Sequence, residues 1–173
     1  MQRFTISVFT EDFIGLLNRV SIVFTRRHLN IESITASESE VKGVHRYTIV
    51  LRTTEEQVQK VVKQLERLVD VLKAFYHAND DTIYQEIALY KLNTDAFSSG
   101  NAEMIVRQHH ARILSVTKDY TVIEKTGHKE DTQALFTDLE TIGVLEFARS
   151  GRVSITKPMK SLATYLNELE ALN

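Results

Sequence analysis

The chain opens with an alternation of apolar and polar side chains. In "RFTISVF" (3–9), Phe4, Ile6 and Val8 share one face, and Thr5 and Ser7 share the other. A period of two is typical of a strand that is buried on one face only. We therefore predict a half-buried strand at the start of the chain.

The period then changes from two to that of a helix. Leu16, Val20, Val23 and Phe24 lie at the spacing of one helix face. This spacing predicts an amphipathic helix with a single buried stripe. The helix is expected to end near "RRH" (26–28), because basic side chains suit the negative end of the helix dipole.

Three further strands and a second helix follow within the first 78 residues. "NIESITASE" (30–38) and "HRYTIVLR" (45–52) are predicted to pair as antiparallel strands, and "DVLKAFYH" (70–77) is predicted to be the last strand. Thr54 and Gln57 have the spacing of a capping box ahead of a second helical stripe. The order is that of a ferredoxin-like βαββαβ fold, in which two helices cover one face of an antiparallel sheet.

The second half of the chain repeats this order after the polar linker "ANDDT" (78–82). "IESIT" (31–35) matches "ILSVT" (113–117), and "LERLVDVLKAF" (65–75) matches "LETIGVLEFA" (139–148). Two matches at corresponding places favour a duplicated topology. The predicted fold class is therefore α+β, with two tandem ferredoxin-like βαββαβ domains, each an antiparallel sheet with two helices on one face.

We predict domain boundaries at residues 1–78 and 83–157. Within the second domain, "RSG" (149–151) is expected to turn one strand into the next. Residues 158–173 form a C-terminal tail that begins at Pro158 and is predicted to be helical from its spaced apolar positions, Leu162, Tyr165, Leu166 and Leu169.

Composition and charge narrow the class of protein. The chain has 173 residues, a formal net charge of -2 and no cysteine, which excludes disulfides and thiolate chemistry. The balance of charges does not predict binding to nucleic acid or to a membrane surface. No signal peptide and no run long enough to span a bilayer are present, so we predict a cytoplasmic protein.

No known catalytic motif occurs in the chain. P-loop, dinucleotide-binding, zinc-protease and nucleophile-elbow patterns are all missing. The six histidines lack ligand spacing, and His109 and His110 are adjacent and so point to different sides of a helix. We expect no catalytic residues and no metal site in this chain.

The stretch "EDFIGLLNRV" (11–20) is the one candidate binding feature. A helix that begins at Gly15 presents unpaired N–H groups and the positive end of its dipole, where an amino acid carboxylate fits. The plainer interpretation is that Gly15 makes a tight strand-to-helix turn and that Asp12 caps the helix. The residues alone leave both interpretations open.

With these residues in view, the sequence resembles the small, regulatory subunit of acetohydroxyacid (acetolactate) synthase, which begins with an ACT domain. The resemblance rests on "SVFTEDFIGLLNRVSIVFTRRHLNIESIT", "QLERLVDVLKA", "QEIALYKL" and "EFARSGRVSI". These segments extend to about residue 157. The run from "GLLNRV" to "NIESIT" resembles this family more closely than it resembles ACT domains in general.

The resemblance implies a non-catalytic subunit that activates a catalytic (large) subunit, which would carry thiamine diphosphate, a divalent metal and FAD. It also implies a homodimer through the ACT domains, with a branched-chain amino acid effector, expected to be valine, bound between them for feedback control. The matching positions are, from one chain, Asp12, Gly15, Leu16 and Leu17, and from its neighbour, Asn30 and Ile31.

The chain departs from the family pattern at two positions. The family usually has asparagine at the position of Asp12 and commonly serine at the position of Ile14. Asp12 could cap the helix, repel a carboxylate or pair with an ammonium, so we expect effector binding of altered strength or selectivity. The alternatives are a free-standing ACT-type amino-acid sensor that acts on another enzyme, and an enzyme of unrecognised type.

Overall fold

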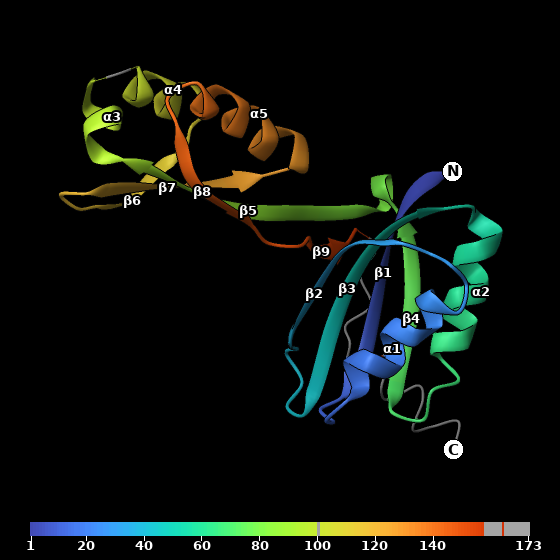
Figure 1. Cartoon of the computed structure of the whole chain (residues 1–173). Coiled ribbons are helices and arrows are strands. Elements are labelled where there is room, and N and C mark those ends of the chain that lie inside the picture. Colours follow the sequence, from blue (N-terminus) through green and yellow to red (C-terminus); the bar gives the residue numbers. More distant parts are fainter. Residues whose placement is uncertain (100, 158–163, 165–173) are drawn as a thin grey trace. The chain divides into compact units, whose positions relative to one another are not determined.

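The computed structural model describes residues 1–99, 101–157 and 164, which divide into two compact units. The first unit comprises Met1–Ile83 together with the chain from Arg152, and the second comprises Tyr84–Gly151 (Figure 1). Residues 152–157 thus lie with the first unit, whereas the sequence placed them in a second domain of 83–157. The helix predicted after Pro158 falls outside the described residues.

The first unit has the predicted order of strands and helices. Its elements are β1 (Gln2–Glu11), α1 (Leu16–Thr25), β2 (Ile31–Glu38), β3 (Val44–Thr53), α2 (Glu55–Leu65) and β4 (Val71–Ala78). The strands form an antiparallel sheet in the order β2-β3-β1-β4, and Figure 1 shows both helices over one face of it. The ferredoxin-like prediction is confirmed for this unit.

The core of the first unit lies between that sheet face and the two helices. Strand residues Phe4, Ile6 and Val8 pack against Val20 of α1 and Val58 of α2, and all five are almost fully buried. The start of α2 is capped as predicted, because the Thr54 hydroxyl accepts a hydrogen bond from the Gln57 N–H at 3.4 Å. The helical stripes read from the sequence therefore define the core correctly.

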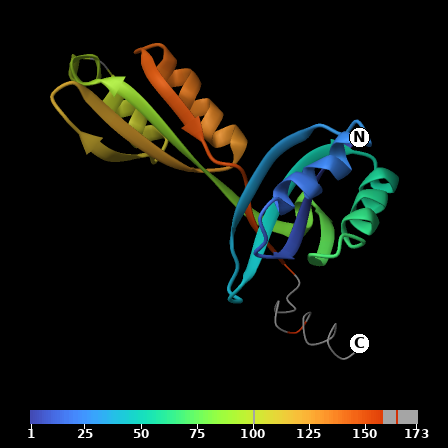
Figure 2. The ribbon, with the colours of Figure 1, turned by 60° about the horizontal axis from the view of Figure 1, so that its bottom comes forward.

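The second unit repeats the topology. After a 3-10 turn, η1 (Asn79–Asp81), the elements are β5 (Thr82–Asn93), α3 (Thr94–Ser99), α4 (Ala102–Gln108), β6 (Arg112–Val116), β7 (Tyr120–Gly127), α5 (Lys129–Glu140) and β8 (Val144–Arg149). The last strand, β9 (Val153–Thr156), belongs to the first unit. Strand order β6-β7-β5-β8 corresponds to β2-β3-β1-β4 of the first unit, with β9 also paired to β5. Figure 2 shows a helix-covered sheet in each unit from a second direction. The duplicated α+β fold is confirmed.

Helix α1 of the first unit and helix α4 of the second unit end in the same way. His28 and His110 both have positive φ, at 54° and 50°. The next N–H then donates back over five residues, from Leu29 to Phe24 O and from Ala111 to Val106 O. This pairing is a Schellman-type helix end, and it directly precedes the matching segments "IESIT" and "ILSVT" in both units.

The alternation predicted that the second face of β1 is exposed to solvent, but this face is buried in the structure. Thr5 and Ser7 are 0% and 1% exposed. The guanidinium of Arg152 donates to the Thr5 hydroxyl at 3.0 Å, and Arg46 Nη2 donates to the carbonyl of Ser154 at 2.5 Å. Chain from the far end of the sequence therefore covers this polar face, which no local pattern could predict.

The residues around "RSG" do not reverse the chain either. β8 and β9 both pair with β5, and the Ser150 N–H donates to the Ile87 carbonyl at 2.8 Å between them. Residues 150–152 therefore separate two strands that both pair with β5. Among the described residues, no helix is long and apolar enough to cross a membrane.

Candidate functional site

The candidate site is the connection between β1 and the first turn of α1. Gly15 stands at the N-cap with φ 84° and ψ 0°, a left-handed conformation that glycine adopts without strain. Among the described residues other than its two chain neighbours, no atom lies within 4 Å of the position a Cβ would occupy there. Glycine is therefore required by the backbone angle, and the space beside it is open.

No side chain of the described residues caps the first turn of α1. The Leu16 N–H donates to the Phe13 carbonyl at 3.3 Å, whereas within the described part of the chain the N–H groups of Leu17 and Asn18 have no acceptor. These two groups stay available to an anion at the positive end of the helix. This geometry favours the ligand interpretation over capping by Asp12.

The Asp12 side chain points to solvent and to a histidine. Its side chain is 65% exposed, and one carboxylate oxygen lies 3.5 Å from Nε2 of His45 on β3. Its backbone N–H donates to the Gly43 carbonyl at 3.1 Å, which fixes the loop. The Asp12 carboxylate therefore stays near the site and does not cap the helix.

Apolar side chains around this loop divide into buried and exposed ones. Leu16 is 0% exposed and belongs to the interior, so only its backbone faces the loop. Leu17 is 46%, Phe13 56% and Ile14 96% exposed. Phe13 was not among the site residues predicted from the sequence. The pattern that could have identified it is an apolar residue between Asp12 and Gly15 that fits neither a helix period nor a strand period. An exposed apolar loop of this kind is typical of a surface that another molecule covers.

Asn30 and Ile31 lie far from this loop within one chain. Ile31 is level with Leu51, which pairs with Phe4, whereas Glu11 pairs with Val44 at the other end of β1. Seven residues of strand correspond to about 23 Å. The two parts of the predicted site can meet only if they come from different chains.

The histidines of the described ranges were the candidates for a metal site. No cluster of three or more potential metal ligands occurs among the described residues. His109 pairs with Asp138 at 2.6 Å, and His128 stacks on Tyr84 with ring centroids 4.3 Å apart. Burial lowers the pKa of His77, which contacts the Phe75 ring. Each of these histidines has a structural partner.

Both halves of the chain match known protein families. The family described as AHAS small subunit-like ACT domain matches residues 6–73, and the family described as small subunit of acetolactate synthase matches residues 85–158. The acetolactate synthase small subunit of Mycolicibacterium smegmatis is 36% identical over 153 residues, which cover 88% of this chain and 90% of that protein. The Bacillus subtilis small subunit is 33% identical over 151 residues, covering 87% and 88%.

A solved structure has the same architecture. The acetolactate synthase small subunit from Thermotoga maritima matches with a TM-score of 0.83 and 26% identity, over 92% of this chain and 100% of that one. The fold and the open helix start define an ACT-domain protein with a second ferredoxin-like domain. More particularly, the chain belongs to the family of acetolactate synthase small subunits.

Proposed function

We propose that this chain is the regulatory subunit of an acetolactate synthase, which binds and activates a separate catalytic subunit. Members of its family are small subunits by name, a term that implies a larger partner. Thiamine diphosphate, a divalent metal and FAD would belong to that partner. The cytoplasmic location stays a prediction.

We further propose that a branched-chain amino acid, valine first among them, binds between the ACT domains of two copies. The carrying observation is the uncapped start of α1, where the Leu17 and Asn18 N–H groups face solvent beside Gly15. These groups would receive the effector's carboxylate, and Leu17 would contact a small branched side chain. Asp12 would lie close enough to attract the ammonium.

Assembly of the second copy is argued from the sheet order. β2 is an edge strand of the first unit, and an edge strand offers unpaired backbone groups to another chain. Two β2 strands paired antiparallel would bring the start of one, with Asn30 and Ile31, toward the opposite end of the other sheet. This arrangement would supply the two parts of the site that one chain keeps about 23 Å apart.

Reconstitution tests this function. Adding the chain to its cognate catalytic subunit should raise the rate of acetolactate formation, and valine should reverse part of the gain. The chain alone with pyruvate and cofactors should give no product. No gain on mixing would contradict the regulatory reading and favour the alternative, an amino-acid sensor that acts on another enzyme.

A further inference from the structure

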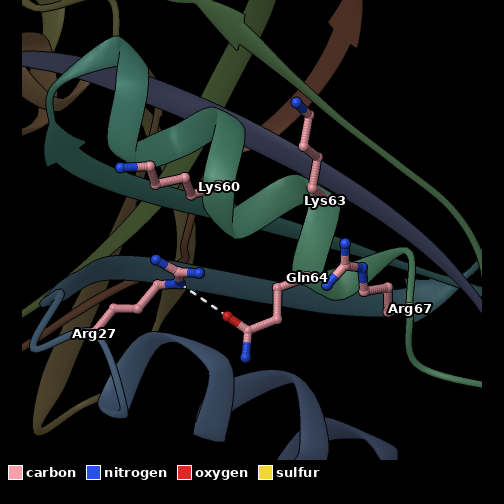
Figure 3. Close-up of a pocket in the computed structure, with 5 residues that line it drawn as sticks. All are labelled: Arg27, Lys60, Lys63, Gln64 and Arg67. Carbon is pink, nitrogen blue, oxygen red and sulfur yellow. Dashed lines mark hydrogen bonds between the residues drawn. The ribbon is translucent and has the colours of Figure 1, made fainter.

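A basic groove lies on the helix-covered side of the first unit, separate from the loop at Gly15. Its lining consists of Arg27, Lys60, Lys63, Gln64 and Arg67, around a hollow of about 530 Å³ (Figure 3). Arg27 follows the end of α1, and the other four residues lie on α2 and just after it. The amino-acid effector needs none of these residues.

Among the residues that the structure describes, three of the four cations have no carboxylate partner. Lys60 pairs with Glu56 at 2.5 Å, and a hydrogen bond from Lys60 lowers the pKa of the Glu56 carboxyl. The neighbouring Glu66 is engaged by Lys73 at 2.9 Å. Over the described ranges, Arg27, Lys63 and Arg67 form no ion pair, so their charge faces outward.

The charges are arranged as a stripe along the helix. Lys60, Lys63 and Arg67 are spaced by three and four residues, which places them on one side of α2 over about 10 Å. Arg27 lies beside this stripe, because its Nε donates to the Gln64 side-chain oxygen at 2.8 Å. This hydrogen bond holds the Arg27 side chain against α2. Figure 3 shows the cationic ends spread along the helix instead of pointing to one centre.

This arrangement favours an extended anionic partner over a compact anion. A phosphate site usually combines backbone N–H groups at a helix N-terminus with converging cations. The basic groove instead lies toward the C-terminal half of α2 and contains separated, long side chains. Carboxylates spaced over one or two helical turns of another protein match its length and its charge.

We propose that the basic groove docks an acidic surface segment of the catalytic subunit and so contributes to association. The proposal rests on the regulatory function proposed above. Charge pairs at the rim of an interface mainly change the rate of association and its salt dependence. Activation by this chain should therefore weaken as ionic strength rises from about 50 to about 300 mM.

Charge reversal in the full-length chain tests the proposal. We expect K63E/R67E to need at least about tenfold more protein for half-maximal activation, with K63Q/R67Q intermediate. K42E/K118E changes the net charge equally at two exposed lysines outside the groove and should activate like the wild type. Circular dichroism and valine calorimetry on each variant check that the fold and the effector site are intact.

The possible results distinguish the docking proposal from the proposed regulatory function and from binding of a small polyanion. If the wild type activates the catalytic subunit and K63E/R67E activates it equally well, the docking proposal is wrong and the proposed function stands. Failure of the wild type itself overturns both. Tripolyphosphate that binds the wild type but not K63E/R67E, with subunit association equal in both, would assign the groove to a small polyanion and also overturn docking.

Discussion

Asp12 and Gly15 lie three residues apart in one loop but act through different atoms. Gly15 contributes a backbone angle, φ 84°, and Asp12 contributes a carboxylate that is 65% exposed. Because no side chain caps α1, the Asp12 charge stays free to influence a ligand. If the proposed effector site is right, its selectivity would depend on a carboxylate oxygen of Asp12 where an asparagine would have an amide nitrogen.

The first prediction concerns Asp12→Asn. Removal of the negative charge from the loop before Gly15 should change valine affinity by about two- to fivefold, which corresponds to roughly 0.5–1 kcal/mol for one exposed charge. Calorimetric titration of valine, leucine and isoleucine into both proteins measures the change. Equal affinities for all three amino acids would remove Asp12 from the site.

Tyr90 yields a prediction about pH. Its side chain is fully buried in the second unit, its hydroxyl donates to the Thr132 carbonyl at 2.6 Å, and burial raises its pKa to about 12. The unfolded pKa is about 10, so the folded state favours the protonated phenol. This contribution is complete below about pH 10 and is lost as the pH rises toward 12.

Urea unfolding of wild type and Tyr90→Phe at several pH values measures this effect. Between about pH 10 and 12 the wild type should lose roughly 2–3 kcal/mol more than the variant, since the other tyrosines are common to both. At neutral pH the variant should be about 1 kcal/mol less stable. Parallel pH profiles would contradict the burial argument.

The element that most affects the site is α1, which begins at a left-handed residue. Its neighbour α2 begins at an extended Thr54 with a side-chain cap, whereas α1 begins at Gly15 without one. The difference leaves α1 with free N–H groups at its start, at the cost of a less stable helix end. An element built in this way is suited to hold a ligand.

The third prediction follows from the backbone of that turn. Gly15→Ala should lower the free energy of unfolding by about 1–2 kcal/mol, because φ 84° is unfavourable for alanine while the space for its Cβ is open. Gly15→Asn should cost less, since asparagine tolerates this conformation. Amide exchange in α1 measures both, and an equal loss for alanine and asparagine would indicate a steric cause.

At the scale of the whole molecule, the chain returns to its own first unit. After β4 ends at residue 78, the chain forms the second unit. It then returns to the first unit, where Arg152 contacts Thr5, 147 residues earlier in the sequence. Arg152 is 1% exposed and also donates to the Asn79 side-chain oxygen at 2.8 Å. The first unit is therefore complete only with residues 152–157.

Arg152→Met tests this closure. Loss of its hydrogen bonds, with Thr5 left buried, should lower the free energy of opening of β1 and β3 amides by about 2–4 kcal/mol in hydrogen exchange. Arg52→Met is the matched control, because the Arg52 side chain is 63% exposed and pairs with Glu32 at the surface. That control should change stability by no more than about 0.5 kcal/mol.

Period and local turn chemistry suffice for most of the fold. The alternation in "RFTISVF", the helical stripe from Leu16 to Phe24 and the Thr54 cap all depend on neighbours within a few residues, so the sequence alone predicts them. The duplicated strand order follows because the same patterns recur. The short helix α3 carries no such pattern and was not predicted.

The tertiary structure decided what distant residues do to one another. The sequence by itself determined two ferredoxin-like units and a helix that starts at Gly15, because both are encoded locally. Only the structure showed that Asp12 does not cap that helix. The sequence could not show that Thr5 and Ser7 are buried, or that Asn30 lies far from Asp12 in one chain. Those facts depend on strand register and on a segment about 147 residues away, where contact is set by packing and not by period.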